Sequence, residues 1–170
     1  MKIIVVSQRV EFITQRNEPR DSLDQRLSDF LLKGGYLPVT IPNIFFINSQ
    51  INKNKYIKTW LKTINPDGIL LSGGNNIGEF KCRDNTEKYL LDYAHTSKKP
   101  LLGICRGMQM IACWAGCGLK EVKGHVRTRH KIDFDGKILE VNSFHNYSIN
   151  SCPQNFTILA KSFDGEIEAI

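Results

Sequence analysis

The sequence predicts an α/β fold in which helices flank a mostly parallel central sheet and a small antiparallel extension follows. Two observations predict this fold. Short apolar runs alternate with helical apolar stripes over residues 2–104, which is the pattern of β-α-β crossovers. Beyond Gly118 the pattern changes to short segments separated by Asp-Gly turns, which is typical of antiparallel strands.

The first predicted strand is Lys2–Val6, a continuous apolar run with β-branched residues, as expected of a strand buried on both faces of a parallel sheet. A polar loop leads from it to a helix, which Ser22 and Gln25 introduce with capping-box spacing. Gly34 and Gly35 end this helix. Its expected buried face consists of Leu23, Leu27, Phe30 and Leu31.

Three further strands are predicted at Tyr36–Ile41, Ile69–Leu71 and Leu101–Ile104. One helix is predicted before the turn at residues 65–68 and another before the last of these strands. The two apolar stripes are Ile57, Trp60, Leu61 and Ile64, and Tyr89, Leu90, Tyr93 and Ala94. Because sites in parallel sheets form at the carboxyl ends of strands, we expect the functional residues on the loops that follow them.

The antiparallel extension is predicted to contain strands at 137–141 and 157–160, with turns at Asp135-Gly136 and Asp164-Gly165. The chain has 170 residues, of which 41% are hydrophobic and 24% charged. This size and balance fit one ordinary core, so we expect residues 1–170 to form a single domain.

The net charge of +6 and the isoelectric point near 9.1 are compatible with an anionic partner. Nucleic-acid binding is disfavoured, because the sequence has neither a basic stripe with aromatic platforms nor a reader motif. The basic stretch from Lys120 to Lys131 is predicted to be a loop, and a phosphate-bearing small substrate fits the charge. Another basic group is expected to be a solvated helix face and consists of Lys53, Lys55, Lys58 and Lys62.

The five cysteines are odd in number and fit no metal-ligand spacing, which favours reduced thiols and no metal or cofactor. The apolar run Ile3–Val6 is too short for a signal peptide or a membrane span. We therefore expect a cytoplasmic protein without membrane contact.

A cysteine stands directly between the fourth strand and a helical segment, in Gly103-Ile104-Cys105-Arg106-Gly107-Met108-Gln109. This spacing of glycines predicts a nucleophile elbow, a tight turn that lifts Cys105 toward a cleft. Helix N-terminal amides favour its thiolate, and the backbone N–H of Arg106 is expected to donate to an oxyanion. The alternative is a buried structural thiol.

The loop Ser72-Gly73-Gly74-Asn75 ends the preceding strand at the same edge of the sheet. We expect the Gly74 amide to be the second oxyanion donor. Alternatively, the two glycines serve backbone geometry only.

Three motifs, Gly103–Met110, Ser72–Asn75 and Asn142–Asn146, carry a family resemblance. With them, nearly the whole chain resembles the γ-glutamyl hydrolase (peptidase C26) branch of the class I glutamine amidotransferases, whose fold is three-layered and flavodoxin-like. Within that branch, Ser7-Gln8-Arg9 and residues 17–24 look most similar to γ-glutamyl-CDP-amidate hydrolases of capsule phosphoramidate synthesis.

The resemblance implies that Cys105 is the nucleophile and that the amides of Gly74 and Arg106 form the oxyanion hole. Gln109 is implied to hold the substrate glutamyl group. Its α-amino and carboxylate pocket is implied to be lined by Ser143, Phe144 and His145.

The family places its catalytic histidine and carboxylate in a terminal His-Pro-Glu motif, and no residue up to Ile170 matches it. We therefore expect a fragment or a truncated protein. His145 is the substitute base that the sequence offers. Glu168 is interpreted as an edge-strand charge, and the remaining histidines are interpreted as solvated surface, namely His95, His125 and His130.

The expected activity of the complete form is hydrolysis of a γ-glutamyl amide through a thioester, with release of glutamate. A CDP-amidate substrate would release cytidine diphosphoramidate, and Arg9, Arg20 and Arg83 are candidate contacts for its pyrophosphate. The alternatives are a glutaminase that delivers ammonia to a synthetase partner, and an inactive module that binds a glutamyl ligand.

Overall fold

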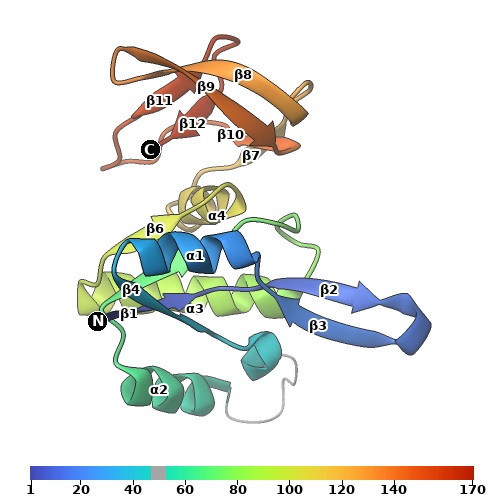
Figure 1. The fold of residues 1–170 in the computed structure, drawn as a ribbon, viewed down its shortest axis with the longest axis vertical. Helices are drawn as coiled ribbons and strands as arrows, with labels where there is room; N and C mark the ends of the chain where they lie inside the picture. Colours follow the sequence, from blue (N-terminus) through green and yellow to red (C-terminus); the bar gives the residue numbers. More distant parts are fainter. Residues whose placement is uncertain (47–52) are drawn as a thin grey trace. The chain divides into compact units, whose positions relative to one another are not determined.

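The computed structural model describes residues 1–46 and 53–170. The chain forms two compact units, residues 1–107 and residues 108–170, and each is described by itself (Figure 1). That residues 1–170 make one domain stays a prediction.

The lysines that were assigned to a solvated helix face are exposed where their side chains are described, namely Lys55, Lys58 and Lys62. The side chain of Lys53 lies outside the described part.

The first unit is built on a four-stranded parallel sheet with the order β4-β1-β5-β6. Its strands are β1 (Lys2–Val6), β4 (Tyr36–Thr40), β5 (Gly68–Leu71) and β6 (Leu101–Gly103). In register, Val5 of β1 lies opposite Val39 of β4 on one side and Ile69 of β5 on the other. The four predicted strands and their parallel arrangement are confirmed.

The residues of strand β5 are buried on both faces of this sheet, as a continuous apolar strand requires. Val6 and Leu70 pack with Leu31 of helix α1 (Gln25–Lys33). Because strand side chains alternate, Val5 faces the opposite side, and it is fully buried as well.

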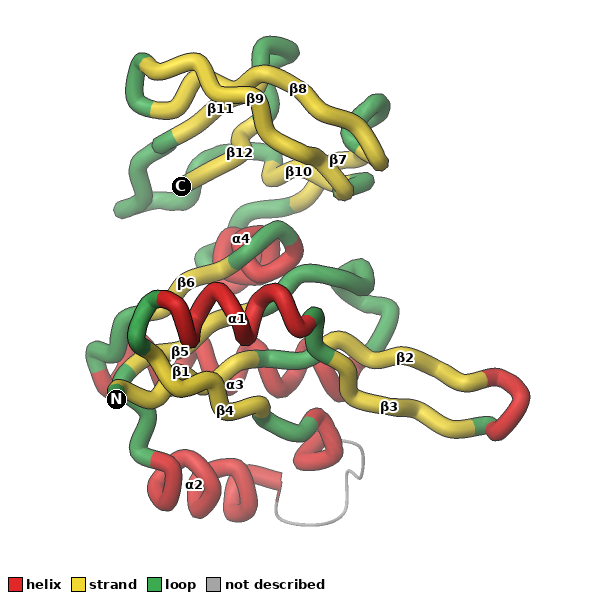
Figure 2. Tube along the Cα trace, viewed as in Figure 1, coloured by secondary structure: helices red, strands yellow, loops and turns green. Residues whose placement is uncertain are grey.

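The other helices are α2 (Lys53–Ile64), α3 (Lys81–Ser97) and α4 (Arg106–Trp114), with short 3-10 turns η1 (Thr14–Arg16) and η2 (Asn43–Phe46) (Figure 2). These helices confirm the helical stripes of the sequence. In α2, the two residues Ile57 and Leu61 are buried one turn apart, as predicted.

Helix α1 begins two residues later than the capping box predicts. Its N-cap is Asp24, whose side chain accepts a hydrogen bond from the amide of Arg26, while Ser22 belongs to a strand. Phe30 is 59% exposed, so its assignment to the buried face was wrong, whereas Leu31 is buried.

The segment predicted as a polar loop after β1 is a β-hairpin of β2 (Arg9–Ile13) and β3 (Glu18–Ser22), closed by η1. Its strands are mostly polar and its turn residue Asn17 has a left-handed φ of 48°. The alternation in β2 is confined to Arg9–Phe12, and β3 is polar and contains Pro19, which explains why the sequence did not indicate this hairpin.

The second unit is antiparallel, as the extension predicts, and contains the sheets β10-β7 and β12-β11-β8-β9. The strands are β7 (Leu119–Glu121), β8 (Val126–Phe134), β9 (Lys137–Phe144), β10 (Tyr147–Ile149), β11 (Ala160–Ser162) and β12 (Ile167–Ala169). The turn at Asp135-Gly136 joins β8 to β9, with φ of 50° and 76°, as expected for a two-residue hairpin loop. The basic stretch predicted as a loop is largely strand β8.

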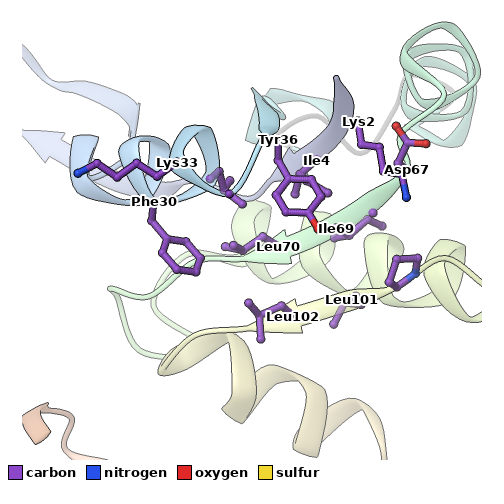
Figure 3. Close-up of a pocket in the computed structure, with 14 residues that line it drawn as sticks. Lys2, Ile4, Phe30, Lys33, Tyr36, Asp67, Ile69, Leu70, Leu101 and Leu102 are labelled. Carbon is purple, nitrogen blue, oxygen red and sulfur yellow. The ribbon is translucent and has the colours of Figure 1, made fainter.

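An apolar pocket of about 600 Å³ opens on the sheet of the first unit beside α1 (Figure 3). Phe30 and Leu102 line it, together with Lys2, Gly68 and Leu101 at the starts of three parallel strands. None of the predicted site residues belongs to its lining. Among the helices of residues 1–46 and 53–170, none has the length and apolar character needed to cross a bilayer.

Candidate active site

The chain turns sharply at Cys105, between the end of β6 at Gly103 and the start of α4 at Arg106. Cys105 has a φ of 53°, in the left-handed region that side chains other than glycine rarely adopt, and it is exposed. Such a backbone conformation costs about 1–3 kcal/mol and persists only where the surrounding structure enforces it. Cys105 is therefore held at a strained, accessible position at the carboxyl end of a parallel strand.

Close packing of Gly107 against β5 enforces this turn. A Cβ at position 107 would stand 2.2 Å from the carbonyl oxygen of Leu71, which also accepts a hydrogen bond from the amide of Ile104 at 2.9 Å. Only glycine lets the first turn of α4 approach the strand so closely.

The loop after β5 lies beside this turn, because the Cβ position of Gly73 is 3.6 Å from the Cβ of Cys105. The Arg83 guanidinium donates to the carbonyl oxygens of Ser72 at 2.8 Å and Gly73 at 3.0 Å, and also to that of Gly74. In a planar trans peptide, the C=O of one residue and the N–H of the next point in opposite directions. Arg83 thereby directs the amide of Gly74 away from itself.

Arg83 was a candidate for pyrophosphate binding in the sequence, and the structure contradicts this. Its side chain is fully buried, and besides the carbonyls it pairs with Glu87 at 3.0 Å. Burial lowers the pKa of Arg83, and the negative charge of Glu87 opposes that effect. The other two candidates lie on the exposed hairpin, where Arg9 pairs with Glu11 and Arg20 with Glu18.

A buried ionic network ties the loops of this region together. The side chain of Arg106 is 2% exposed and pairs with Asp84 at 2.5 Å and with Glu87. Glu87 also accepts a hydrogen bond from the Ser7 hydroxyl at 2.8 Å, and the Ser7 Oγ accepts one from the amide of Ser72 at 2.9 Å. The network joins the carboxyl ends of β1 and β5 with α3 and α4.

This network could not be recognised in the sequence. The spacing of Arg83 and Glu87 is that of an i,i+4 helix pair, which usually marks a solvated surface. Only the burial of both side chains separates this pair from a surface one, and burial on a largely polar helix leaves little signal in one sequence.

In the second unit, two of the predicted pocket residues meet at the carbonyl of Tyr147. Gln109 donates its side-chain amide to this oxygen at 2.7 Å, and His145 Nδ1 lies 3.0 Å from it. Ser143 donates its hydroxyl to the carbonyl of His125 at 2.7 Å. The structure therefore brings Gln109, Ser143 and His145 into one cluster, whereas Phe144 is 62% exposed.

Three histidines surround the carboxylate of Glu168 in this unit. The distances from its oxygens are 3.3 Å to His125 Nδ1, 3.4 Å to His145 Nε2 and 3.6 Å to His130 Nε2. His125 is 2% exposed, so its interpretation as solvated surface was wrong. His130 is largely covered too, whereas His95 is exposed as expected. Glu168 does lie on an edge strand, but its carboxylate points into this cluster and is not a solvated charge.

The charges of this cluster shift its pKa values in opposite directions. The hydrogen bond with Glu168 raises the pKa of His145, although burial opposes it. Burial works to raise the pKa of Glu168, but the hydrogen bond from His145 and the charges of the three histidines outweigh burial and lower it. The Glu168 carboxylate is therefore ionised at neutral pH.

No disulfide joins the five cysteines, all of which lie in the described residues. Cys82, near the start of α3, is half-buried, and burial raises the pKa of its thiol above the ordinary value.

Residues 38–170 match the family model described as glutamine amidotransferase class-I. The chain is also similar to curated proteins. It is 35% identical over 107 residues to gamma-glutamyl-CDP-amidate hydrolase of Campylobacter jejuni, covering 59% of this chain and 53% of that protein. It is 31% identical over 130 residues to a glutamine-hydrolysing GMP synthase subunit of Methanocaldococcus jannaschii, covering 71% of this chain and 61% of that protein.

Among solved structures, a GMP synthase subunit of Thermoplasma acidophilum superposes with a TM-score of 0.68 at 21% identity, over 98% of this chain and 76% of that chain. A glutamine amidotransferase of Thermotoga maritima superposes with the same TM-score at 17% identity, over 98% of this chain and 69% of that chain. These neighbours share the fold. The chain belongs to the class I glutamine amidotransferase family, and it spans between half and two thirds of the length of the two curated relatives described above.

Proposed function

We propose that this chain carries the nucleophilic part of an enzyme that hydrolyses a γ-glutamyl amide, with Cys105 as the nucleophile. The observation that carries the proposal is the left-handed backbone of Cys105, exposed between a parallel strand and a helix and locked by Gly107. A strained residue at the carboxyl end of a strand is typical of catalytic nucleophiles.

The reaction begins when the Cys105 thiolate attacks the carbonyl carbon of the γ-glutamyl amide. The C–N bond breaks, the nitrogen leaves after taking up a proton, and a thioester remains on the sulfur. Water then attacks the thioester, which releases glutamate and restores the thiol. The positive end of the α4 dipole, at the residue after Cys105, favours the thiolate.

The oxyanion is proposed to be stabilised by the backbone amides of Gly74 and Arg106. Arg106 is the first residue of α4, and amides in the first turn of a helix have no partner within it. The Gly74 amide belongs to a loop that lies against Cys105 and is oriented by Arg83. Removal of one such donor typically costs about 10²–10³ in rate.

The glutamyl group is proposed to be recognised by Gln109 and residues Ser143–His145. The support is the hydrogen bonding that fixes the orientations of three of these side chains, with Gln109 and His145 at the Tyr147 carbonyl and Ser143 at the His125 carbonyl. The alternative role for His145 is the general base. Because Nδ1 of His145 lies 3.0 Å from the Tyr147 carbonyl and Nε2 lies 3.4 Å from Glu168, this role requires one of the two contacts to open.

The leaving group is proposed to be a nucleotide-linked amidate, so that a substrate such as CDP-L-glutamine gives cytidine diphosphoramidate and glutamate, a step of capsule modification. The similarity to gamma-glutamyl-CDP-amidate hydrolase favours this substrate. The second candidate is a glutaminase that delivers ammonia to a synthetase partner, which the similarity to the glutamine-hydrolysing subunit of GMP synthase favours.

The first experiment is the intact mass of the chain after exposure to 6-diazo-5-oxo-norleucine, beside a Cys105→Ala variant. One adduct that requires Cys105 is expected. A Cys82→Ala variant is the matched control and should be labelled like the parent chain. Binding of a γ-glutamyl ligand without any adduct would instead make the chain a glutamyl-binding module.

The leaving group is tested by following glutamate release from CDP-L-glutamine and from glutamine under the same conditions. Faster release from the nucleotide-linked substrate is expected. Release from glutamine alone, increased by a synthetase partner, would replace this substrate with the glutaminase function.

A further inference from the structure

Three of the four histidines of the chain gather in the second unit with Glu168. They come from different places in the fold: His125 precedes β8, His145 follows β9, and Glu168 lies in β12. Among the described residues, one nitrogen of each of these two histidines and a Glu168 oxygen lie within 4.8 Å of one another. Imidazole and carboxylate are ligands that zinc and related divalent ions accept.

The outer nitrogen of each histidine is fixed by a group that only accepts hydrogen bonds. His125 Nε2 lies 2.8 Å from the Asp164 carboxylate, and His145 Nδ1 lies 3.0 Å from the Tyr147 carbonyl. Both outer nitrogens must therefore carry hydrogen, so in the neutral rings His125 Nδ1 and His145 Nε2 present lone pairs. A carboxylate or a carbonyl behind a histidine is the usual support of a metal-binding imidazole.

The inner atoms are spaced as ligands of one ion. His125 Nδ1 lies 3.3 Å from His145 Nε2, and the Glu168 oxygens lie 3.3 Å and 3.4 Å from these two nitrogens. With zinc–ligand bonds of about 2.0–2.1 Å, a tetrahedral site separates its ligand atoms by about 3.3 Å. Two lone pairs facing each other and a carboxylate at this distance repel unless a positive charge lies between them.

Two buried polar atoms at the cluster have no hydrogen-bond partner, namely Glu168 Oε1 and His130 Nε2, which lie 3.6 Å apart. A buried polar atom without a partner costs about 1–3 kcal/mol, so such atoms point to a missing ligand. The His130 ring contacts that of His125 edge-on, with centroids 4.6 Å apart.

We propose that His125, His145 and Glu168 bind a divalent transition-metal ion, with zinc as the ion that best fits the ligand set and its spacing. His130 lies beside this site, with Nε2 3.6 Å from Glu168 Oε1. The ion joins β12 to the ends of β8 and β9. The competing occupant is a proton shared between His145 and Glu168, which would leave the cluster free of metal.

The test is a titration of the chain with zinc, carried out in the Cys105→Ala background so that this thiol takes no part. One tightly bound zinc per chain is expected. His145→Ala and Glu168→Gln should each weaken zinc binding at least a hundredfold. His95→Ala is the matched control, because His95 lies in the other unit, and it should leave zinc affinity unchanged.

Cobalt(II) provides a second readout that needs no variant of the cluster. A bound cobalt ion with visible d–d bands and without a thiolate charge-transfer band is expected, because the proposed ligands are nitrogen and oxygen. Absence of stoichiometric binding, a thiolate band, or binding that survives both substitutions would overturn the proposal.

Discussion

Gly107 and Leu71 lie so close together that a Cβ on residue 107 would stand 2.2 Å from the Leu71 carbonyl oxygen. The backbone of α4 cannot retreat without moving the turn at Cys105. We therefore predict that Gly107→Ala lowers the free energy of unfolding by about 3 kcal/mol or more, because the added methyl group would overlap the backbone of β5. Urea unfolding of the chain measures this change.

Gly73→Ala is the control for that substitution, because its Cβ would meet its nearest neighbour at 3.6 Å, an ordinary contact. It should unfold within about 1 kcal/mol of the parent chain. Equal stability losses at positions 73 and 107 would contradict the packing argument.

Glu87 is the shared partner of two buried guanidinium groups, those of Arg83 and Arg106. Glu87→Gln keeps the shape, but Arg83 loses its carboxylate partner and Arg106 keeps only Asp84. We expect a loss of about 3–5 kcal/mol in unfolding free energy, the usual result of breaking a buried ion pair. Lys88→Gln on the exposed side of the same helix should cost less than about 0.5 kcal/mol. An equally mild Glu87→Gln would refute the role of the network.

Arg83 orients three successive carbonyls of the loop at Ser72–Gly74. Lysine keeps the charge but lacks the planar fork of donors, so Arg83→Lys should release the loop. We expect labelling of Cys105 by 6-diazo-5-oxo-norleucine to slow by about tenfold or more, because an oxyanion donor is lost. Circular dichroism must show that the variant is folded. Unchanged labelling of a folded variant would show that Arg83 does not orient an oxyanion donor.

The parallel sheet could be predicted from the sequence because its strands are short apolar runs, as Ile3–Val6 and the buried strand Gly68–Leu71 show. The hairpin at Arg9–Ser22 could not, since its polar strands bury almost nothing. The N-cap moved from Ser22 to Asp24 because residue 22 pairs in that hairpin, a long-range contact that overrides local capping preference.

For the site, the glycines around Cys105 predicted the sharp turn, because the residues that allow a tight turn lie next to it in the sequence. The surroundings of Glu168 could not be predicted in this way. His125 and Glu168 are more than forty residues apart, and the basic residues around His125 resemble a solvated loop. Only the pairing of the antiparallel sheet brings these side chains together.

Cys82 provides a prediction on the pH dependence of thiol reactivity. Burial raises the pKa of its thiol, so at neutral pH a smaller fraction of Cys82 is the reactive thiolate than in an unfolded chain. Below the pKa, this thiolate fraction grows tenfold per pH unit. We expect iodoacetamide to alkylate Cys82 more slowly in the folded chain than in denaturant, by a nearly constant factor while the pH stays below the ordinary thiol pKa of about 8.5, with the two rates converging only above it. Peptide mass mapping measures the rates, and equal rates in both states would contradict the shift.

Asp164 holds His125 from behind in the proposed metal site, with its carboxylate 2.8 Å from Nε2. The hydrogen bond from His125 lowers the pKa of Asp164 to about 2, so the carboxylate stays ionised and accepts this hydrogen bond at every pH at which the chain would be handled. Removing such a support from a metal-binding histidine typically costs 10- to 100-fold in metal affinity, so Asp164→Ala should weaken zinc binding by about that factor. Asp164→Asn should fall between it and the parent chain, because an amide oxygen still accepts the hydrogen bond but carries no charge. Asp135→Asn, at the exposed turn of the same unit, is the control and should leave the zinc affinity unchanged. If Asp164→Ala binds zinc as tightly as this control, His125 either needs no hydrogen bond from its outer nitrogen or is not a zinc ligand.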